Sequence, residues 1–171
     1  MNVGSNPTPC SYNWKMKEIK VKQFEYRRAQ APNILETTGI GPCIAIGAIY
    51  RNKGHMIHVS SLSLGGLSER LVARMLQNLK TEEAGRKFLK LFIAGGGLVN
   101  DEEVDQTILK DREATLEMIS EVGLESYIRK IGWNERWCTQ TLALHLEENM
   151  AVYESLSDYL DGFEPDREEV Y

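Results

Sequence analysis

One cysteine and two histidines stand close together in a segment whose turns are rich in glycine. Cys43 follows the turn sequence Gly39-Ile40-Gly41-Pro42, and His55 and His58 follow the next apolar segment. A cysteine attacks a carbonyl as its thiolate, and a neighbouring imidazole can take the thiol proton. Backbone N–H groups of a glycine turn can stabilise the oxyanion that then forms. Cys43 is therefore a candidate nucleophile; the alternative is a small, inert cysteine packed in a core.

The segment around these residues has the pattern of a β-hairpin. Cys43 to Tyr50 is almost entirely apolar, as expected of a strand covered on both faces, and Met56 to Leu62 resumes strand-forming residues. Between them, Arg51-Asn52-Lys53-Gly54 has the composition of a turn. His55 is three residues from His58, so in a regular strand it faces the other side.

The apex of the hairpin decides whether His58 can face Cys43. An apex between Tyr50 and Arg51 would oppose Cys43 and His58 directly, with about 5 Å between their Cβ atoms. An apex at Asn52-Lys53, which the turn residues favour, opposes Gly47 to His58 and leaves Cys43 about 13 Å along the strand. A bulge or a wider loop would then be needed to bring the pair together.

The remaining segments predict an α+β protein. Two stretches have the apolar periodicity of amphipathic helices: Ser68 to Lys80, with Ser68 as N-cap, and a second one that ends at Gly123. The predicted strands are Ile19–Tyr26, followed by a linker over residues 27–33, then Ile34–Thr38, Lys87–Ala94 and a hairpin of Cys138–Leu146 with Met150–Tyr153. We therefore expect a sandwich of mainly antiparallel β-sheet with two main amphipathic helices packed on it.

The length of 171 residues suits one domain. We place it at residues 18–155, between a loose N-terminal tail (1–17) and an acidic C-terminal tail (156–171) that could add one helical turn. No apolar run is long enough for a signal peptide or a membrane helix, so we expect a cytoplasmic protein without membrane insertion.

Charge and motif content exclude several functions. A net charge of −5 without a basic patch argues against nucleic-acid binding. Cys10, Cys43 and Cys138 have no C-x-x-C spacing, and the three histidines have no metal-ligand spacing, so we expect no metal and no cofactor. His145 lies in a predicted strand and nothing in its spacing marks it as functional. The run Gly95-Gly96-Gly97 lacks the register of a nucleotide-binding fingerprint.

The sequence resembles the CheD family of bacterial chemoreceptor glutamine deamidases, which is related in fold to the catalytic domain of cytotoxic necrotizing factor toxins. The family's T-x-G-x-G-x-C motif is similar to Thr37-Thr38-Gly39-Ile40-Gly41-Pro42-Cys43, and its G-x-M-x-H motif to Gly54-His55-Met56-Ile57-His58. Its A-G-G stretch is similar to Ala94-Gly95-Gly96. The likeness covers roughly Ile19 to Tyr153.

The resemblance implies a cysteine hydrolase that converts a glutamine side chain of a partner protein to glutamate. Cys43 would be the nucleophile, His58 the general base and acid, and Thr37 the third polar residue of the site. The substrate or oxyanion loop would comprise Thr38, Gly39, Gly41, Gly95 and Gly96. Pro42 stands where the family usually has a serine, and it has no N–H to donate to an oxyanion.

The same resemblance implies a chemoreceptor-like protein as substrate and a regulatory phosphatase as a further partner. Two alternatives stay open. The chain could be a catalytically silent binding or regulatory module with the same fold. It could also be a methylesterase or another amidase, because esters and amides pass through similar tetrahedral intermediates on a Cys–His site.

Overall fold

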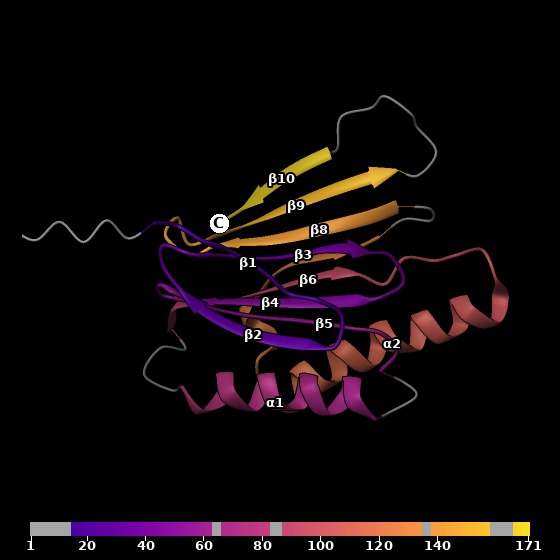
Figure 1. Ribbon diagram of the computed structural model, residues 1–171. Helices are drawn as coiled ribbons and strands as arrows, with labels where there is room; N and C mark the ends of the chain where they lie inside the picture. The colour runs from indigo at the N-terminus through magenta and orange to yellow at the C-terminus, as the bar shows by residue number, and fades with distance from the viewer. Residues whose placement is uncertain (1–14, 63–65, 83–86, 135–137, 158–165) are drawn as a thin grey trace, which may run out of the picture.

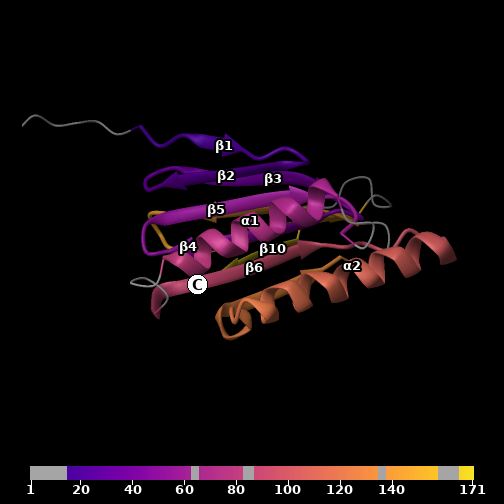
Figure 2. The same ribbon diagram turned by 90° about the horizontal axis from the view of Figure 1, so that it is seen from below.

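Two five-stranded sheets lie face to face, and both helices cover the outer face of the second sheet (Figures 1 and 2). The computed structural model describes residues 15–62, 66–82, 87–134, 138–157 and 166–171. Six of the eight strand pairings are antiparallel, and the parallel ones join β1 to β3 and β6 to β7. This arrangement confirms the predicted α+β sandwich.

The strands alternate between the two sheets along much of the chain. The first sheet has the order β1 (Glu18–Lys20), β3 (Ile34–Ile40), β8 (Cys138–His145), β9 (Met150–Ser157) and β10 (Asp166–Val170). The second has the order β2 (Glu25–Gln30), β5 (Lys53–Val59), β4 (Ile44–Tyr50), β6 (Leu89–Gly95) and β7 (Ile128–Trp133). A short 3-10 helix, η2 (Glu125–Tyr127), leads into β7.

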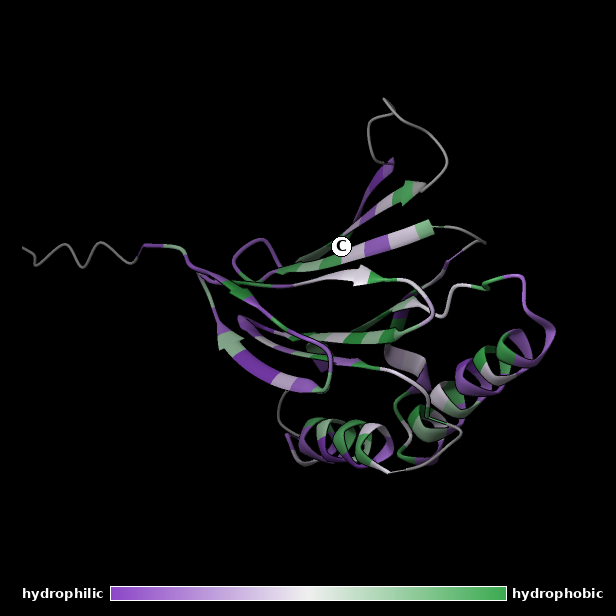
Figure 3. Ribbon diagram, turned by 45° about the vertical axis from the view of Figure 1, so that its right-hand side comes forward, coloured by the Kyte–Doolittle hydropathy of each residue, from purple (hydrophilic) through white to green (hydrophobic). Residues whose placement is uncertain are grey.

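The second sheet is the middle layer of the molecule and has a hydrophobic core on each side. Every residue of β4 except the last is buried, as predicted for a strand covered on both faces. The core between the two sheets includes Leu35, Ile49, Met56, Phe92 and Leu144. The core between the second sheet and the helices includes Ile46, Ile57, Val72, Met75 and Ile119. Figure 3 shows these central strands as predominantly hydrophobic.

Helix α1 (Leu67–Thr81) has the predicted apolar stripe, but the predicted N-cap is wrong. Ser68 lies inside the first turn and is buried, whereas the N-cap position is Gly66, with a φ of 85° and no side-chain hydrogen bond to the helix. Gly66 can take this left-handed backbone conformation because it has no Cβ atom. The chain therefore turns at Gly66, and the helix begins before the serine that was expected to cap it.

Helix α2 (Glu102–Glu121) is longer than its apolar pattern indicated and ends where predicted. Asp101 caps it by accepting a hydrogen bond from the Val104 N–H at 3.1 Å. At the other end, Gly123 N donates to Ser120 O and Leu124 N donates to Ile119 O. These two bonds form a Schellman motif, in which Gly123 takes a positive φ of 73°.

The single strand predicted over Ile19–Tyr26 is two strands in different sheets. Between β1 and β2 the chain turns over Lys22–Glu25, where Glu25 N donates to Lys22 O at 3.0 Å. The predicted linker is also partly wrong, because β2 continues to Gln30. Lys22 and Gln23 are two consecutive polar residues, so the apolar positions change from Ile19 and Val21 to Phe24 and Tyr26. This shift in the alternation marks the turn, and the prediction of one continuous strand overlooked it.

Two strands were not predicted. Strand β7 pairs in parallel with β6, and β10 pairs antiparallel with β9 where we expected a helical turn in the acidic tail. Four of the five β10 residues are exposed, so its sequence lacks the apolar signal of a strand. The fold thus continues beyond the predicted boundary at residue 155. Residues 1–14, with Cys10, and 158–165 lie outside the described residues.

Candidate functional site

The register of the β4–β5 hairpin lies midway between the two registers considered from the sequence, in which His58 was opposite Cys43 or opposite Gly47. Tyr50 pairs with Lys53, so the two-residue loop is Arg51-Asn52, and Ala45 is the residue opposite His58. Arg51 has a φ of 54°, which lets this loop close. Both predicted apices are therefore wrong by one residue, one in each direction.

This register places Cys43 and His58 on the same face of the second sheet. Cys43 directly precedes β4, two residues before Ala45, and it is half-buried against the core between the sheets. Residues two apart in a strand share a face, so Cys43 and His58 are diagonal neighbours across the hairpin. Such neighbours are about 7–8 Å apart at the backbone, within reach of a long side chain such as histidine.

Thr37 reaches the same face from the first sheet. Its side chain is 1% exposed, and its Oγ1 lies 2.8 Å from Nδ1 of His58. Just beyond Thr37, the register of β3 against β8 shifts by one residue between Thr37 and Ile40. Gly39, with a φ of 68°, lies in this β-bulge. The bulge interrupts the regular pairing next to the candidate site, and the pairing resumes at Ile40.

The structure leaves the second ring nitrogen of His58 buried and available. His58 is 5% exposed, and its Nε2 has no hydrogen-bond partner among the described residues. Burial lowers the pKa of His58 from its ordinary value, which favours the neutral imidazole at pH 7. With Nδ1 held by Thr37, Nε2 is the nitrogen that can exchange a proton with a substrate or with Cys43.

Burial acts on Cys43 in the opposite sense. Loss of solvation raises the pKa of the thiol, and a hydrogen bond from the backbone N–H of Cys43 itself lowers it by a smaller amount. The resting pair is therefore a neutral thiol and a neutral imidazole. Proton transfer to His58 would have to accompany nucleophilic attack, because a preformed thiolate–imidazolium pair is disfavoured.

A pocket of about 390 Å³ opens beside His58. Its lining includes Thr38 and Gly39 of the β3 bulge, together with Lys20, Val21, Lys22, Gln23 and Glu36. Gln23 also donates a hydrogen bond from its Nε2 to Sγ of Cys43 at 3.3 Å. The sequence did not single out Gln23, because it belongs to the turn before β2 and no motif connects it to the cysteine.

Three of the predicted oxyanion donors are already used inside the protein. Gly95 N donates to Gln140 Oε1 at 2.9 Å, and Gly96 N donates to Cys43 O at 2.7 Å. Gly41 N donates to Gly39 O at 3.1 Å. Each of these N–H groups would have to break an internal hydrogen bond to bind an oxyanion, so in this structure the three amides hold the loop together.

Gly95 fixes the position of Cys43. A Cβ atom at Gly95 would lie 2.0 Å from the carbonyl oxygen of Cys43, and the φ of Gly95 is 100°. No other residue type fits this backbone conformation and this close approach. The Ala94-Gly95-Gly96 stretch therefore packs directly against the backbone of Cys43.

Polar side chains from α2, β8 and the end of β7 form hydrogen bonds with the backbone next to Cys43. Asn134 donates from Nδ2 to Ile40 O, and Arg112 donates from Nε to Gly96 O at 2.9 Å. Gln140 receives the Gly95 amide described above. These residues were not predicted as part of the site. They are distant from Cys43 in the sequence, and only folding brings them close to it.

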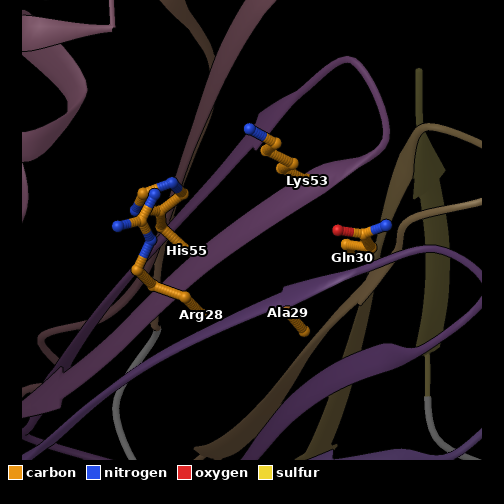
Figure 4. A pocket seen from close by; sticks show the side chains of 5 residues that line it. All are labelled: Arg28, Ala29, Gln30, Lys53 and His55. Atoms are coloured by element: carbon orange, nitrogen blue, oxygen red, sulfur yellow. The ribbon is translucent and has the colours of Figure 1, made fainter.

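His55 lies on the opposite face of β5, as predicted. Its Nδ1 is 2.7 Å from the hydroxyl of Tyr26, and its Nε2 is 3.8 Å from Glu82 at the end of α1. A second pocket, of about 320 Å³, is lined by His55, Arg28 and Lys53 with Ala29 and Gln30 (Figure 4). Burial lowers the pKa of His55 to about 4, helped by the Arg28 and Lys53 charges.

The other predicted features are not part of the site. His145 pairs with Ile34, at the end of β3 away from the bulge. Within the part of the chain that the structure describes, no group of three or more His, Cys, Asp or Glu side chains could hold a metal ion. In the same part, no helix is both long and apolar enough to cross a membrane.

Comparison with known proteins does not assign a family or a function to this chain. No protein-family model and no curated protein sequence matches the chain. Among solved structures, the chain is similar to the crystal structure of the hypothetical protein YfiH of Bacillus licheniformis, with 12% identity and a TM-score of 0.42. The match covers 64% of this chain and 49% of that one, so this chain spans about half of the YfiH structure.

Proposed function

We propose that the protein is a cysteine hydrolase that converts a glutamine side chain of a partner protein to glutamate. One observation carries this proposal: His58 shares a sheet face with Cys43, has Nδ1 within 2.8 Å of Thr37 Oγ1, and leaves Nε2 buried without a partner among the described residues. Burial of a polar atom without a partner costs free energy, so such an atom calls for an explanation. Proton exchange with the Cys43 thiol would explain it.

The reaction would proceed through a thioester. His58 Nε2 takes the thiol proton while Sγ attacks the side-chain carbonyl carbon of the glutamine. A candidate donor for the resulting oxyanion is the backbone N–H of Cys43, which already contacts its own sulfur. The carbon–nitrogen bond then breaks, and the leaving nitrogen takes the proton from Nε2 to depart as ammonia. Water, deprotonated by His58, hydrolyses the thioester and restores the thiol.

The contact between Gln23 and Cys43 supports a carboxamide as the substrate group. The Gln23 amide donates to Sγ at 3.3 Å and lines the pocket beside His58, so a glutamine side chain fits next to the thiol. An ester lacks the N–H that makes this bond, which favours deamidation over the methylesterase alternative. By the resemblance to the CheD family, we propose that the glutamine is presented by a chemoreceptor-like protein in the cytoplasm, with a phosphatase as a regulatory partner.

Replacement of the cysteine tests this function. We expect Cys43→Ala to reduce ammonia release from a glutamine-containing substrate protein by at least about 10³-fold, because the nucleophile is removed. Cys138→Ala is the matched control, since it makes the same change at a half-buried cysteine of β8. Wild-type ammonia release by Cys43→Ala would end the proposal.

A measurement on the thiol needs no substrate. We expect iodoacetamide to alkylate Cys43 at a rate that rises with pH and depends on His58, with the modified cysteine identified by peptide mass spectrometry. A Cys43 that reacts no faster than Cys138, and equally in a His58→Ala variant, would favour the silent binding module.

A further inference from the structure

The turn before β2 holds a glutamine over the candidate nucleophile. Within this turn, Phe24 N donates to His58 O at 2.7 Å and Glu25 N donates to Lys22 O at 3.0 Å. Phe24 has a φ of 63°, a conformation that bulky residues rarely adopt. The turn is therefore anchored to the backbone of His58 itself, and Gln23 lies at its first central position.

The side chain of Gln23 is within reach of chemical attack. Its Nε2 is 3.3 Å from Sγ of Cys43. The adjoining amide carbon–nitrogen bond is about 1.33 Å, so the Gln23 carbonyl carbon Cδ lies at most about 4.6 Å from Sγ. Reacting atoms in near-attack geometry are about 3–3.5 Å apart. Rotation about the Cγ–Cδ bond would turn the face of the Gln23 carboxamide towards the sulfur, and a shift of the side chain would bring Cδ closer to it.

His58, the residue needed for proton transfer, lines the same pocket as Gln23. His58 and Gln23 both line the pocket of about 390 Å³, and His58 Nε2 is buried without a partner among the described residues. Gln23 itself is exposed at the mouth of the site, where water can reach it. A glutamine, a thiol and an unpaired imidazole nitrogen thus meet within one chain.

We propose that Cys43 deamidates Gln23 of the same chain, so that Gln23 is a self-modification site. This inference rests on the function proposed above and adds a substrate that the protein carries itself. Sγ bonds to Cδ of Gln23 as its proton passes to His58, and the amide nitrogen leaves as ammonia with that proton. Hydrolysis of the thioester by one water molecule gives a glutamate side chain at position 23 and restores the thiol.

The product would restrain the enzyme. A carboxylate at position 23, beside Sγ, places a negative charge next to the developing thiolate and so raises the pKa of Cys43. The carboxylate also lacks the N–H that Gln23 donates to the sulfur. Self-deamidation would therefore occur once per chain and leave a less reactive thiol.

Peptide mass spectrometry of the full-length protein tests the proposal. We expect the peptide that contains position 23 to be heavier by about one dalton in the wild type, because a carboxylic acid has replaced the amide, and unmodified in Cys43→Ala and Cys43→Ser. Gln30 is the internal control, since it is exposed at the far end of β2 and lines the other pocket. It should stay a glutamine in all three proteins.

The possible outcomes separate this inference from the proposed function. An intact Gln23 after incubation of the wild type at mildly alkaline pH, with Cys43 still alkylated in a His58-dependent manner, would overturn self-deamidation alone. An inert Cys43 together with an intact Gln23 would overturn both. Deamidation of Gln23 in the Cys43 variants, or equal conversion of Gln30, would mean a spontaneous reaction and would also overturn the inference.

A substitution that mimics the product gives a second measurement. We expect Gln23→Glu to slow iodoacetamide labelling of Cys43 by about tenfold relative to Gln23→Asn, which corresponds to a rise of about one unit in the thiol pKa. Gln30→Glu adds the same charge at the other end of β2 and should leave the labelling rate unchanged. Equal labelling of Gln23→Glu and Gln23→Asn would contradict the effect of the product.

Discussion

His55 and His58 lie three residues apart on β5 and have opposite surroundings. His55 faces the helices, is 0% exposed, and lies against Tyr26 and Glu82. His58 faces the first sheet, with Thr37 at one ring nitrogen and a pocket beside it. Both imidazoles have a lowered pKa because of burial, so their charge does not distinguish them. What differs is the set of groups that each ring can reach.

The comparison shows that strand parity decides which histidine can do chemistry. Side chains alternate between the two faces of a strand, so an odd spacing sends two similar residues into different layers. The layer between the sheets also receives Cys43 and Thr37, whereas the layer under the helices receives neither. The Gly-His-Met-Ile-His segment thus supplies one histidine to the candidate site and one to a supporting contact.

Replacement of each histidine by glutamine should separate their roles most strongly. We expect His58→Gln to slow ammonia release from a glutamine-containing substrate by about 10²–10⁴-fold, as for loss of a general base. His55→Gln should change the rate by less than about threefold, because His55 faces away from Cys43. Iodoacetamide labelling of Cys43 supplies a readout that needs no substrate. Equal losses in the two variants would remove the distinction.

Acid should destabilise the protein through His55, and burial of His58 acts in the same direction. Its folded-state pKa of about 4 lies below the unfolded value of 6.5, so below pH 6.5 the unfolded chain binds a proton that the folded chain excludes. Stability should therefore fall as the pH drops from 6.5 to 4, by about 3 kcal/mol from this residue. Urea unfolding at several pH values measures this loss.

The matched variant for this acid effect is His55→Gln, which cannot titrate. Its stability should depend less on pH over the same interval, while Tyr26 can still hydrogen-bond to the new side chain. A wild-type stability that is constant between pH 6.5 and 4 would show that His55 is not kept neutral by the fold.

Loss of the Thr37 hydroxyl should have the smallest of these effects. Thr37→Val keeps the shape of the side chain but leaves Nδ1 of His58 without the hydroxyl 2.8 Å away. We expect about a tenfold slower reaction, because the hydrogen bond at one ring nitrogen sets the tautomer at the other. Thr37→Ser should restore the rate and the pH profile. A Thr37→Val enzyme with the wild-type profile would mean that Thr37 only fills space.

Much of the fold was predictable, because most of its elements have strong periodicity. The apolar run of β4, the stripe of α1 and the glycine stop of α2 each predicted an element that the structure confirms. The failures occurred where the local signal is weak. The turn at Lys22–Glu25 is marked only by two adjacent polar residues, Lys22 and Gln23, and β10 is a charged edge strand that only its pairing with β9 defines.

The candidate site was predictable in its residue types but not in its geometry. Residue types and spacing selected Cys43 and His58, and the motif resemblance added Thr37, while the turn composition favoured an apex that the structure does not have. A shift of one residue in the loop moves every opposed pair, and local residue preferences are too weak to decide such a shift. The resemblance placed Gly95 in a substrate or oxyanion loop, yet the hydrogen bond of its amide depends on a distant partner, Gln140.

The sequence by itself determined which chemistry is available: a thiol, two imidazoles three residues apart, and glycines where the backbone must turn. Tertiary structure alone decided which of these groups meet. Stacking of the two sheets brings Thr37 to His58, the hairpin register sets His58 diagonal to Cys43, and the turn before β2 places Gln23 on the thiol. These contacts join residues from separate segments of the chain. Local sequence preferences do not encode them, because burial of the hydrophobic cores is what brings these segments together.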